Sequence, residues 1–277
     1  MSTILQHRTG NVGVITINRR ARFNAFDVVT AQDFRRAALQ YARDDGVRAV
    51  VLRGAGGVFC SGADLKYIRA GGAETDLGHL QPAARGIPRG YGEVFKQILE
   101  YLHSTISEIR RSPKPFIAAV DGVAAAGGLG IAMACDLVVA SSRASFEWAY
   151  GKTGLSGAES GTFFLPRLVG FRRAMGLVLL NERLTASEAL AAGLVNRVLP
   201  AEGFDEEVER LAARLAAGPT GAYAAAKRLI NQGLNAERLD VHLDLEIDEL
   251  ARSADSEDFR LALDAFLEKR EASFTGR

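Results

Sequence analysis

Two short segments rich in glycine and alanine could expose backbone amides to a bound molecule, residues 54–65 and 122–136. Each follows an apolar run of strand length, and small side chains around Ala63 leave the first set of amides uncovered. A helix is expected to start near Gly127, where the amides lack intrahelical partners and lie at the positive end of the helix dipole. If the Ala63 and Gly127 amides converge on one carbonyl oxygen, they would stabilise the negative charge that develops when a thioester is enolised, attacked or hydrolysed.

Glycines after a strand also have simpler explanations. Many only form tight turns, and the same residues could belong to a dinucleotide-binding fingerprint. That fingerprint is incomplete, because Phe59 occupies the last glycine position of a G-x-G-x-x-G pattern begun at Gly54, and residues 127–130 do not complete one either. The pattern therefore disfavours a nicotinamide cofactor.

The elements around these turns alternate between strands and helices. An amphipathic helix is predicted over residues 27–43, and a long one over residues 91–111. Alternation of this kind implies βαβ crossovers and a mainly parallel sheet. The runs with strand character are 12–17, 47–52, 116–120, 137–140 and 194–199.

Two further stretches set the domain organisation. Residues 70–90 hold several glycines and two prolines, which predicts a long functional loop. After Pro200 the chain reads as four helices with no strand between them, at 204–217, 220–231, 239–253 and 256–270. We therefore expect a core over residues 1–200 and a separate helical layer over residues 201–277.

Composition excludes several classes of protein. The formal net charge is +1, so no broad electrostatic field would attract nucleic acid or an anionic membrane. Cys60 and Cys135 lie in apolar small-residue segments and are expected to be buried thiols. The first eight residues lack a signal pattern, and no apolar run approaches the roughly 20 residues of a membrane span. We expect a soluble cytoplasmic protein.

Several short motifs follow one another along the chain: VITIN at 14–18, NA at 24–25, VFCSGADL at 58–65, KPFIAAVDG at 114–122, AGG at 126–128, ACD at 134–136, LPRLVG at 165–170, ASEALAAGLV at 186–195 and FLEKR at 266–270. Taken in this order, they resemble the motifs of the crotonase (enoyl-CoA hydratase/isomerase) superfamily. The resemblance implies an α/β fold built as a spiral of ββα units, with a C-terminal helical trimerisation layer. It also implies an acyl-CoA thioester as substrate, with no other cofactor and no metal, and a homotrimer or dimer of trimers.

The resemblance also assigns roles to particular positions. Ala63 and Gly127 match the two residues whose amides form the family's oxyanion hole. For Arg22, a solvated loop charge is an equally good interpretation. The positions that match the family's substrate site are Arg22, Ala25, Ser61, Asp64, Leu65, Gly128 and Tyr150.

The sequence departs from the family where hydratases hold two catalytic glutamates. These positions are Gly130 and Tyr150 here, so a two-glutamate addition of water is not expected. The nearest carboxylate is Glu159, in a turn where several isomerases of the superfamily carry a single acid. An ungapped alignment places that acid at Ala158, one residue earlier. Burial would raise the pKa of Glu159 and suit it to move a proton, although it could instead cap the following helix.

His103 is a further candidate. It borders the apolar stripe of the long helix and matches an active-site histidine of the similar 4-chlorobenzoyl-CoA dehalogenases; a structural role is the alternative. Tyr150 matches an aromatic residue of those enzymes, but their nucleophilic aspartate aligns with Ala158. Dehalogenation therefore lacks its covalent step.

The favoured function is that of an enoyl-CoA hydratase/isomerase-family enzyme in which isomerisation prevails over hydration. The enolate would lie in the Ala63/Gly127 hole, Glu159 would move the proton, and the 70–90 loop would close over the acyl group. The alternatives are a catalytically silent acyl-CoA-binding homologue and, less favoured, a thioester hydrolase using Ser61 or Ser160, or a dehalogenase.

Overall fold

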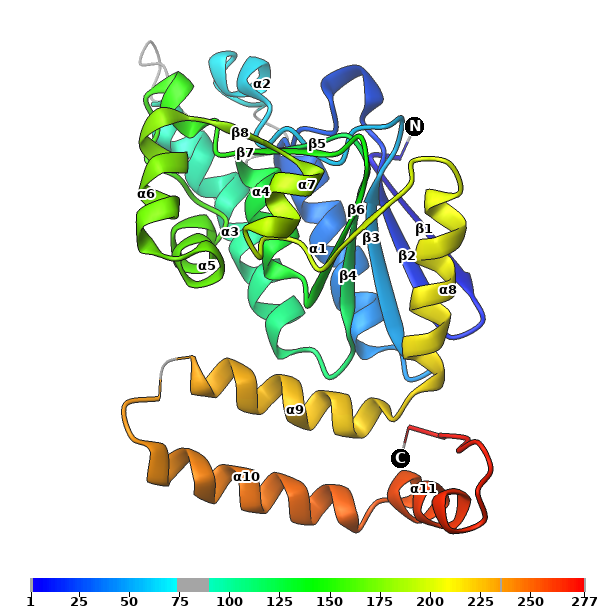
Figure 1. The fold of residues 1–277 in the computed structure, drawn as a ribbon. Helices are drawn as coiled ribbons and strands as arrows, with labels where there is room; N and C mark the ends of the chain where they lie inside the picture. Colours follow the sequence, from blue (N-terminus) through cyan, green and yellow to red (C-terminus); the bar gives the residue numbers. More distant parts are fainter. Residues whose placement is uncertain (1, 74–89, 235, 277) are drawn as a thin grey trace.

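The central element of the protein is a six-stranded sheet in the order β1-β2-β3-β4-β6-β9. The computed structural model describes residues 2–73, 90–234 and 236–276. β1 pairs antiparallel with β2, and every other neighbouring pair is parallel, as the alternation of strands and helices predicts (Figure 1). The strands are β1 (Ile4–Thr9), β2 (Val12–Ile17), β3 (Ala49–Gly54), β4 (Phe116–Val120), β6 (Leu137–Ser141) and β9 (Arg197–Leu199).

Both faces of this sheet are covered at its centre, so β2, β3 and β4 are apolar on both sides. In β3, Val50 and Leu52 belong to the main core with α1 (Val28–Arg43) and α3 (Tyr91–Arg111). The alternate residues Ala49 and Val51 pack with residues of α8 (Phe204–Ala217) on the opposite face. This period of two explains why the strands lack an alternating polar pattern.

The helices of the core agree closely with the sequence. α3 has the predicted bounds, and α1 begins one residue later than expected because Asp27 is its N-cap and accepts a hydrogen bond from the Thr30 amide. Strand β3 begins two residues later than predicted and β9 three residues later. The predicted 70–90 loop lies largely outside the described residues.

A second, three-stranded sheet was not predicted. It runs in the order β5-β7-β8, with β5 (Val123–Ala125) parallel to β7 (Ser145–Glu147) and β7 antiparallel to β8 (Arg183–Thr185). Three-residue strands are too short to show a period, which explains the omission. This sheet leads directly into α4 (Gly127–Ala134), so it positions the second glycine turn.

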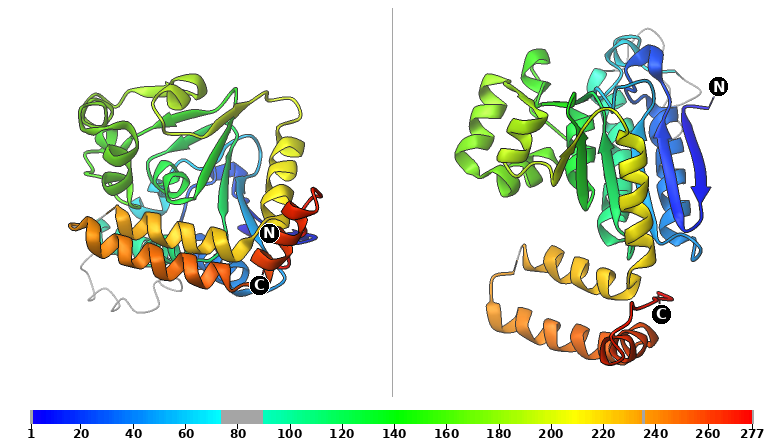
Figure 2. Two further views of the ribbon diagram at one scale, coloured as in Figure 1. Left: turned by 60° about the horizontal axis from the view of Figure 1, so that its bottom comes forward. Right: turned by 45° about the vertical axis from the view of Figure 1, so that its right-hand side comes forward.

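The separate helical layer begins one helix later than predicted. α8 (Phe204–Ala217) packs on the main sheet, since Phe204, Val208 and Leu211 form a core with β2, β3 and β4. The boundary predicted at residue 200 is therefore wrong. The layer itself consists of α9 (Thr220–Gly233), α10 (Leu239–Ala254) and α11 (Glu257–Leu267). Figures 1 and 2 show these helices as a separate layer at one end of the core.

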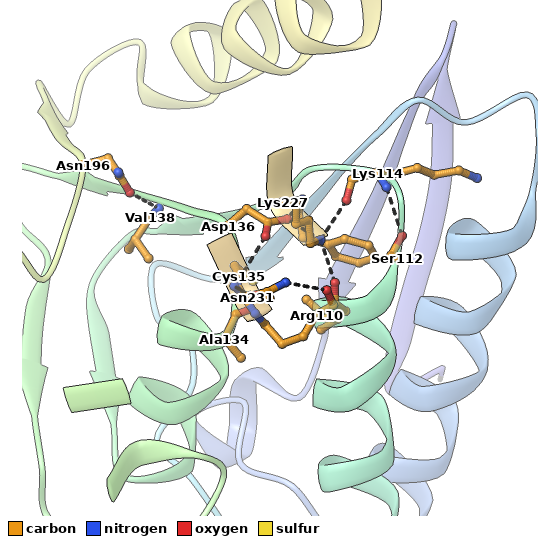
Figure 3. Close-up of polar contacts among 12 residues, drawn as sticks. Arg110, Ser112, Lys114, Ala134, Cys135, Asp136, Val138, Asn196, Lys227 and Asn231 are labelled. Atoms are coloured by element: carbon orange, nitrogen blue, oxygen red, sulfur yellow. Dashed lines mark hydrogen bonds and ion pairs between the residues drawn. The ribbon is translucent and has the colours of Figure 1, made fainter. Parts of the chain in front are cut away.

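A polar cluster fastens α9 to the core (Figure 3). Lys227 of α9 donates to Asp136 Oδ2 at 2.7 Å and to the Ile109 carbonyl at 2.7 Å. Asn231, one turn later, donates to the Arg110 carbonyl at 3.0 Å, while Arg110 pairs with Asp136. Because Asp136 also accepts from the Phe116 amide, one carboxylate ties α9 to α3 and β4.

Of the remaining helices, α7 (Ala186–Ala191) packs against β7 and β8 of the second sheet, and the capping box at Thr185 starts it. Pro166 lies inside α5 (Gly161–Val169). No helix in the described part of the chain is long and apolar enough to cross a membrane. Cys60 and Cys135 are free and buried, as expected. The remaining short elements are α2 (Leu65–Arg69), α5 (Gly161–Val169), α6 (Phe171–Leu180), α7 (Ala186–Ala191) and the 3-10 helices η1 (Arg20–Arg22) and η2 (Tyr150–Thr153).

Candidate functional site

The first glycine turn runs from the end of β3 to the start of α2. Ala63 forms an isolated parallel bridge with Phe26, whose amide donates to the Gly62 carbonyl at 2.8 Å. Asp64 then caps α2 by accepting from the Lys66 and Tyr67 amides, as the sequence predicts. Ala63 therefore lies between the bridge to Phe26 and the capped start of α2, and these bonds fix its peptide.

The second glycine turn joins β5 to α4. Ala126 is the N-cap of α4 and has φ 46° and ψ −120°, a sparsely populated conformation that costs on the order of 1–3 kcal/mol. Its amide donates to the Glu147 carbonyl of β7, which holds the turn against the second sheet. Gly127, the first residue of the helix, therefore starts from a fixed and strained backbone.

The two turns lie against each other. A Cβ built on Gly62 would lie 2.9 Å from the Ala126 Cβ and 3.1 Å from the Gly127 nitrogen. Gly128 is equally close to the first turn, since a Cβ there would lie 2.8 Å from the Cys60 Cβ. Among the described residues, neither the Ala63 amide nor the Gly127 amide donates a hydrogen bond. The Gly62–Ala63 segment thus lies against the start of α4, beside the Gly127 amide.

A pocket of about 450 Å³ opens beside these turns. Its wall combines both turns with the stretch from Ala149 to Glu159 and with one face of α3. Apolar side chains dominate it, which suits an acyl group. The lining residues are Ser61, Ala63, Leu65, Gly92, Phe95, Leu99, Ala126, Ala149, Tyr150, Lys152, Thr153, Leu155, Ser156, Gly157, Ala158 and Glu159.

Glu159 is the one carboxylate among the described residues that line this pocket. It is 3% exposed, and burial raises its pKa to about 7, against the lowering effect of a hydrogen bond from the Tyr150 hydroxyl. Oε1 of Glu159 points to the second turn, since a Cβ built on Gly127 would lie 2.7 Å from it. A carboxyl group that titrates near neutral pH can both accept and return a proton.

The Glu159 side chain does not cap α5, the alternative that the sequence left open. Ser160 is the N-cap, and no side chain makes a capping bond there. Both Glu159 and Ser160 have positive φ values, 44° and 61°. Backbone conformations of this kind concentrate at functional sites.

Gly130 cannot carry a side chain in this structure. A Cβ there would lie 2.8 Å from the Glu159 Cβ and closer still to its carbonyl oxygen. The Glu159 backbone thus fills the space next to the position where hydratases hold their first glutamate. The second such position, Tyr150, supplies the hydroxyl that binds Glu159.

Several predicted residues reach the pocket and others do not. Ser61, Leu65 and Tyr150 line it, whereas Gly128 is buried behind it. Asp64 is buried in an ion pair with Arg19 at 3.1 Å, and Arg22 lies 3.8 Å from the same carboxylate. Arg22, Ala25 and Asp64 are not among the residues that line the cavity in the described part of the chain.

His103 lies apart from this pocket. It is exposed on α3, one turn beyond Leu99, and does not line the cavity in the part of the chain that the structure describes. Burial of part of the ring lowers its pKa. The structure therefore does not bring together the two predicted proton-transfer groups, Glu159 and His103.

Sequence reasoning missed some residues of the site. Phe95 and Leu99 belong to the apolar stripe of α3, so their signal was present but indicated only core packing. Lys152 also lines the pocket, and its ammonium group pairs with the buried Glu147, which Arg183 contacts from the other side at 2.8 Å. Burial opposes the charge of Glu147, but these two cations hold its pKa below the ordinary value.

Comparisons with known proteins agree with the geometry. The family model described as "Enoyl-CoA hydratase/isomerase" matches residues 7–85 and 89–277. The 1,2-epoxyphenylacetyl-CoA isomerase of Escherichia coli K12 is 34% identical, with 100% of each chain covered. A probable enoyl-CoA hydratase of Rhodobacter capsulatus is 37% identical, covering 99% of this chain and 98% of the relative. The crystal structure of an enoyl-CoA hydratase from Polaromonas sp. JS666 superimposes with a TM-score of 0.87 at 32% identity, covering 98% of this chain and 99% of that one. These matches confirm the predicted fold class.

Proposed function

Because the chain belongs to the enoyl-CoA hydratase/isomerase family, which acts on acyl-CoA thioesters, we propose that it isomerises an enoyl-CoA by moving one proton. The observation that carries this proposal is Glu159, a buried carboxyl group that lines the pocket beside two free backbone amides. One relative bears the name of an isomerase. The 1,2-epoxyphenylacetyl thioester in that name and a 3-enoyl thioester both carry protons on the carbon next to the carbonyl.

The reaction starts with the thioester oxygen between the amides of Ala63 and Gly127. Oε1 of Glu159 removes a proton from the α-carbon, and the electron pair moves into the carbonyl, where the two amides bind the oxyanion. The protonated Glu159 then returns the proton to the γ-carbon, and the double bond shifts by one position. Substrate and product have the same composition, so the reaction as proposed needs no cofactor beyond the CoA of the substrate.

Isomerisation is favoured over hydration by the number of acids at the site. Addition of water to a double bond needs one group for the water and another for the α-carbon. In the described part of the pocket Glu159 is the sole carboxylate, and Gly130 has no room for a second one. A single acid of intermediate pKa suffices for a 1,3-proton shift.

The test is double-bond migration in a 3-enoyl-CoA, catalysed by the wild-type protein and by Glu159→Gln. The variant keeps the shape of the side chain and the hydrogen bond from Tyr150 but cannot take up a proton. We expect turnover to fall by about 10²- to 10⁴-fold, with acyl-CoA affinity retained. Glu206→Gln, on the exposed face of α8, is the matched control.

Each other outcome identifies a different function. Undiminished turnover of Glu159→Gln would remove Glu159 from the mechanism. Tight binding of acyl-CoA without turnover of any thioester by the wild-type protein would favour the silent binding homologue. Hydration of a 2-enoyl-CoA at a rate above migration would show that water is activated by a group outside the proposed set.

The C-terminal layer is proposed to join subunits, as a homotrimer or a dimer of trimers. Its support is a set of large apolar side chains that α10 and α11 leave exposed. Light scattering tests this, with a monomer at micromolar concentration as the contradicting result. The side chains are Leu239 (72% exposed), Ile247 (65%), Leu250 (73%), Phe266 (79%) and Leu267 (69%).

A further inference from the structure

We propose that Tyr150 is a positioning residue that reserves one oxygen of Glu159 for the substrate. Its hydroxyl donates to Oε2, whereas Oε1 is the oxygen nearer the second glycine turn: a Cβ built on Gly127 would lie 2.7 Å from Oε1 and 3.2 Å from Oε2. This inference rests on the proposed function, since it gives different roles to the two oxygens of the Glu159 carboxyl group. The resemblance had placed Tyr150 against the acyl group instead.

The backbone of Tyr150 is bonded at both its amide and its carbonyl. The carbonyl accepts from the Leu155 amide at 3.1 Å and from the Thr153 hydroxyl at 3.0 Å, and the amide donates to the Trp148 carbonyl at 2.8 Å. The phenol ring packs on Trp148 with ring centroids 5.1 Å apart. A donor held in this way fixes the carboxyl plane of Glu159, because rotation about the last side-chain bond would break the bond to Oε2.

Trp148 supports the same turn from the other side. A Cβ built on Gly161 would lie 2.9 Å from the Trp148 ring, and one built on Gly157 would lie closer still, so the indole contacts the chain both before and after Glu159. The Trp148 indole thus packs against the backbone on both sides of Glu159, and the Tyr150 hydroxyl bonds its carboxyl group. Neither contact involves Oε1, which has no hydrogen-bond partner among the described residues.

The other groups around Glu159 do not compete for this role. Cys60 lies behind it, and burial raises the pKa of that thiol to about 12, so it stays neutral. Lys152 lines the same pocket but pairs with Glu147. Burial, together with the adjacent Glu159, raises the pKa of the Tyr150 phenol, so it remains a donor throughout turnover.

The division of oxygens has a kinetic consequence. A hydrogen bond to the carboxylate favours the charged form, which is the form that removes the α-proton. The same bond orients Oε1 toward the α-carbon and limits the loss of orientation between the two proton transfers. Loss of the hydroxyl should therefore change both the pH dependence and the maximal rate while leaving substrate affinity nearly intact.

The experiment compares Tyr150→Phe with wild type in 3-enoyl-CoA isomerisation across pH. We expect the acidic limb of kcat/KM to move upward by about one pH unit. kcat at its alkaline plateau should fall about tenfold with KM within twofold. Tyr41→Phe removes a buried hydroxyl that bonds the His7 carbonyl far from the pocket, and it should leave the pH profile unchanged.

An unshifted limb with unchanged kcat in Tyr150→Phe would overturn the inference. If Glu159→Gln is inactive in the same assay, the proposed function survives that failure; if Glu159→Gln is fully active, the proposed function itself fails.

Should Tyr150→Phe not fold, protein with 3-fluorotyrosine at its six tyrosines replaces it. The more acidic phenol is a stronger donor, so the limb should then move downward, and an unmoved limb contradicts the inference.

Discussion

Glu159 lies directly over Gly130, with its Cβ 2.8 Å from the place that a Gly130 side chain would occupy. The two residues come from different elements: Gly130 is inside α4, and Glu159 belongs to the turn before α5. A side chain at one position therefore excludes the observed backbone at the other. With the Glu159 backbone in this place, position 130 has no room for a glutamate.

Gly130→Ala should disable the site without abolishing the fold. The new methyl group must push the Glu159 backbone aside, so turnover should fall at least tenfold while acyl-CoA still binds. Steady-state kinetics and calorimetry with acyl-CoA measure the two effects. Gly176→Ala is the control, because a Cβ at Gly176 in α6 meets nothing within 4 Å and should stabilise that helix by up to about 1 kcal/mol. Equal activity of the two variants would contradict the steric relationship.

The pH dependence of catalysis should report Glu159. Burial raises its pKa to about 7, and the charged form is the base. kcat/KM should therefore fall as pH drops below about 7, since the free enzyme then holds the neutral acid. Initial rates between pH 5 and 9 measure this limb. A rate that stays constant down to pH 5 would mean that another group is the base.

The same burial should make Glu159→Gln more stable than wild type at alkaline pH. The folded-state pKa lies above the ordinary value of 4.5, so the contribution of the neutral acid to folding is complete below pH 4.5 and is lost as pH rises through about 7. Above pH 7 the variant should gain roughly 3 kcal/mol in free energy of unfolding, and below pH 4.5 the difference should vanish. Urea titrations at both pH values measure it, and a variant less stable than wild type at pH 8 would refute the assignment.

Lys227→Met should loosen the C-terminal layer. Lys227 is the cation of α9 that bonds Asp136, and burial lowers its pKa against the raising effect of that carboxylate. Its removal leaves Asp136 with Arg110 as the remaining cation, so the free energy of unfolding should fall by about 3 kcal/mol. Urea denaturation compares it with Lys96→Met on the exposed side of α3, for which we expect less than about 0.5 kcal/mol. Equal effects would mean that the cluster does not fasten the layer.

The sequence predicted the elements that have a clear period. The bounds predicted for α3 agree with the structure because its apolar residues, among them Val94, Ile98 and Leu102, recur at helical spacing along 21 residues. The assignment of α8 to the outer layer was wrong, because an amphipathic stripe indicates that a helix packs on something but not on what. The strands of the second sheet are three residues long and could not be predicted from periodicity.

The candidate site was predicted in part. The two glycine turns were found because uncovered amides after buried strands are visible in the sequence, and the structure brings those turns together. The bond from Tyr150 to Glu159 could not be found, since it depends on the positive φ values at Ala149 and Glu159 that turn the two side chains toward each other. His103 was proposed because it borders the helical stripe and matches the dehalogenase histidine; it is exposed and is not among the described residues that line the pocket.

The most direct test of the account is exchange of the α-protons of a saturated acyl-CoA in D₂O, followed by proton NMR. Such a thioester can be enolised but cannot be isomerised, so exchange isolates the step assigned to Glu159 and the amides of Ala63 and Gly127. The account predicts steady exchange by the wild-type protein and a loss of at least 100-fold in Glu159→Gln. Exchange by Glu159→Gln at the wild-type rate would contradict it.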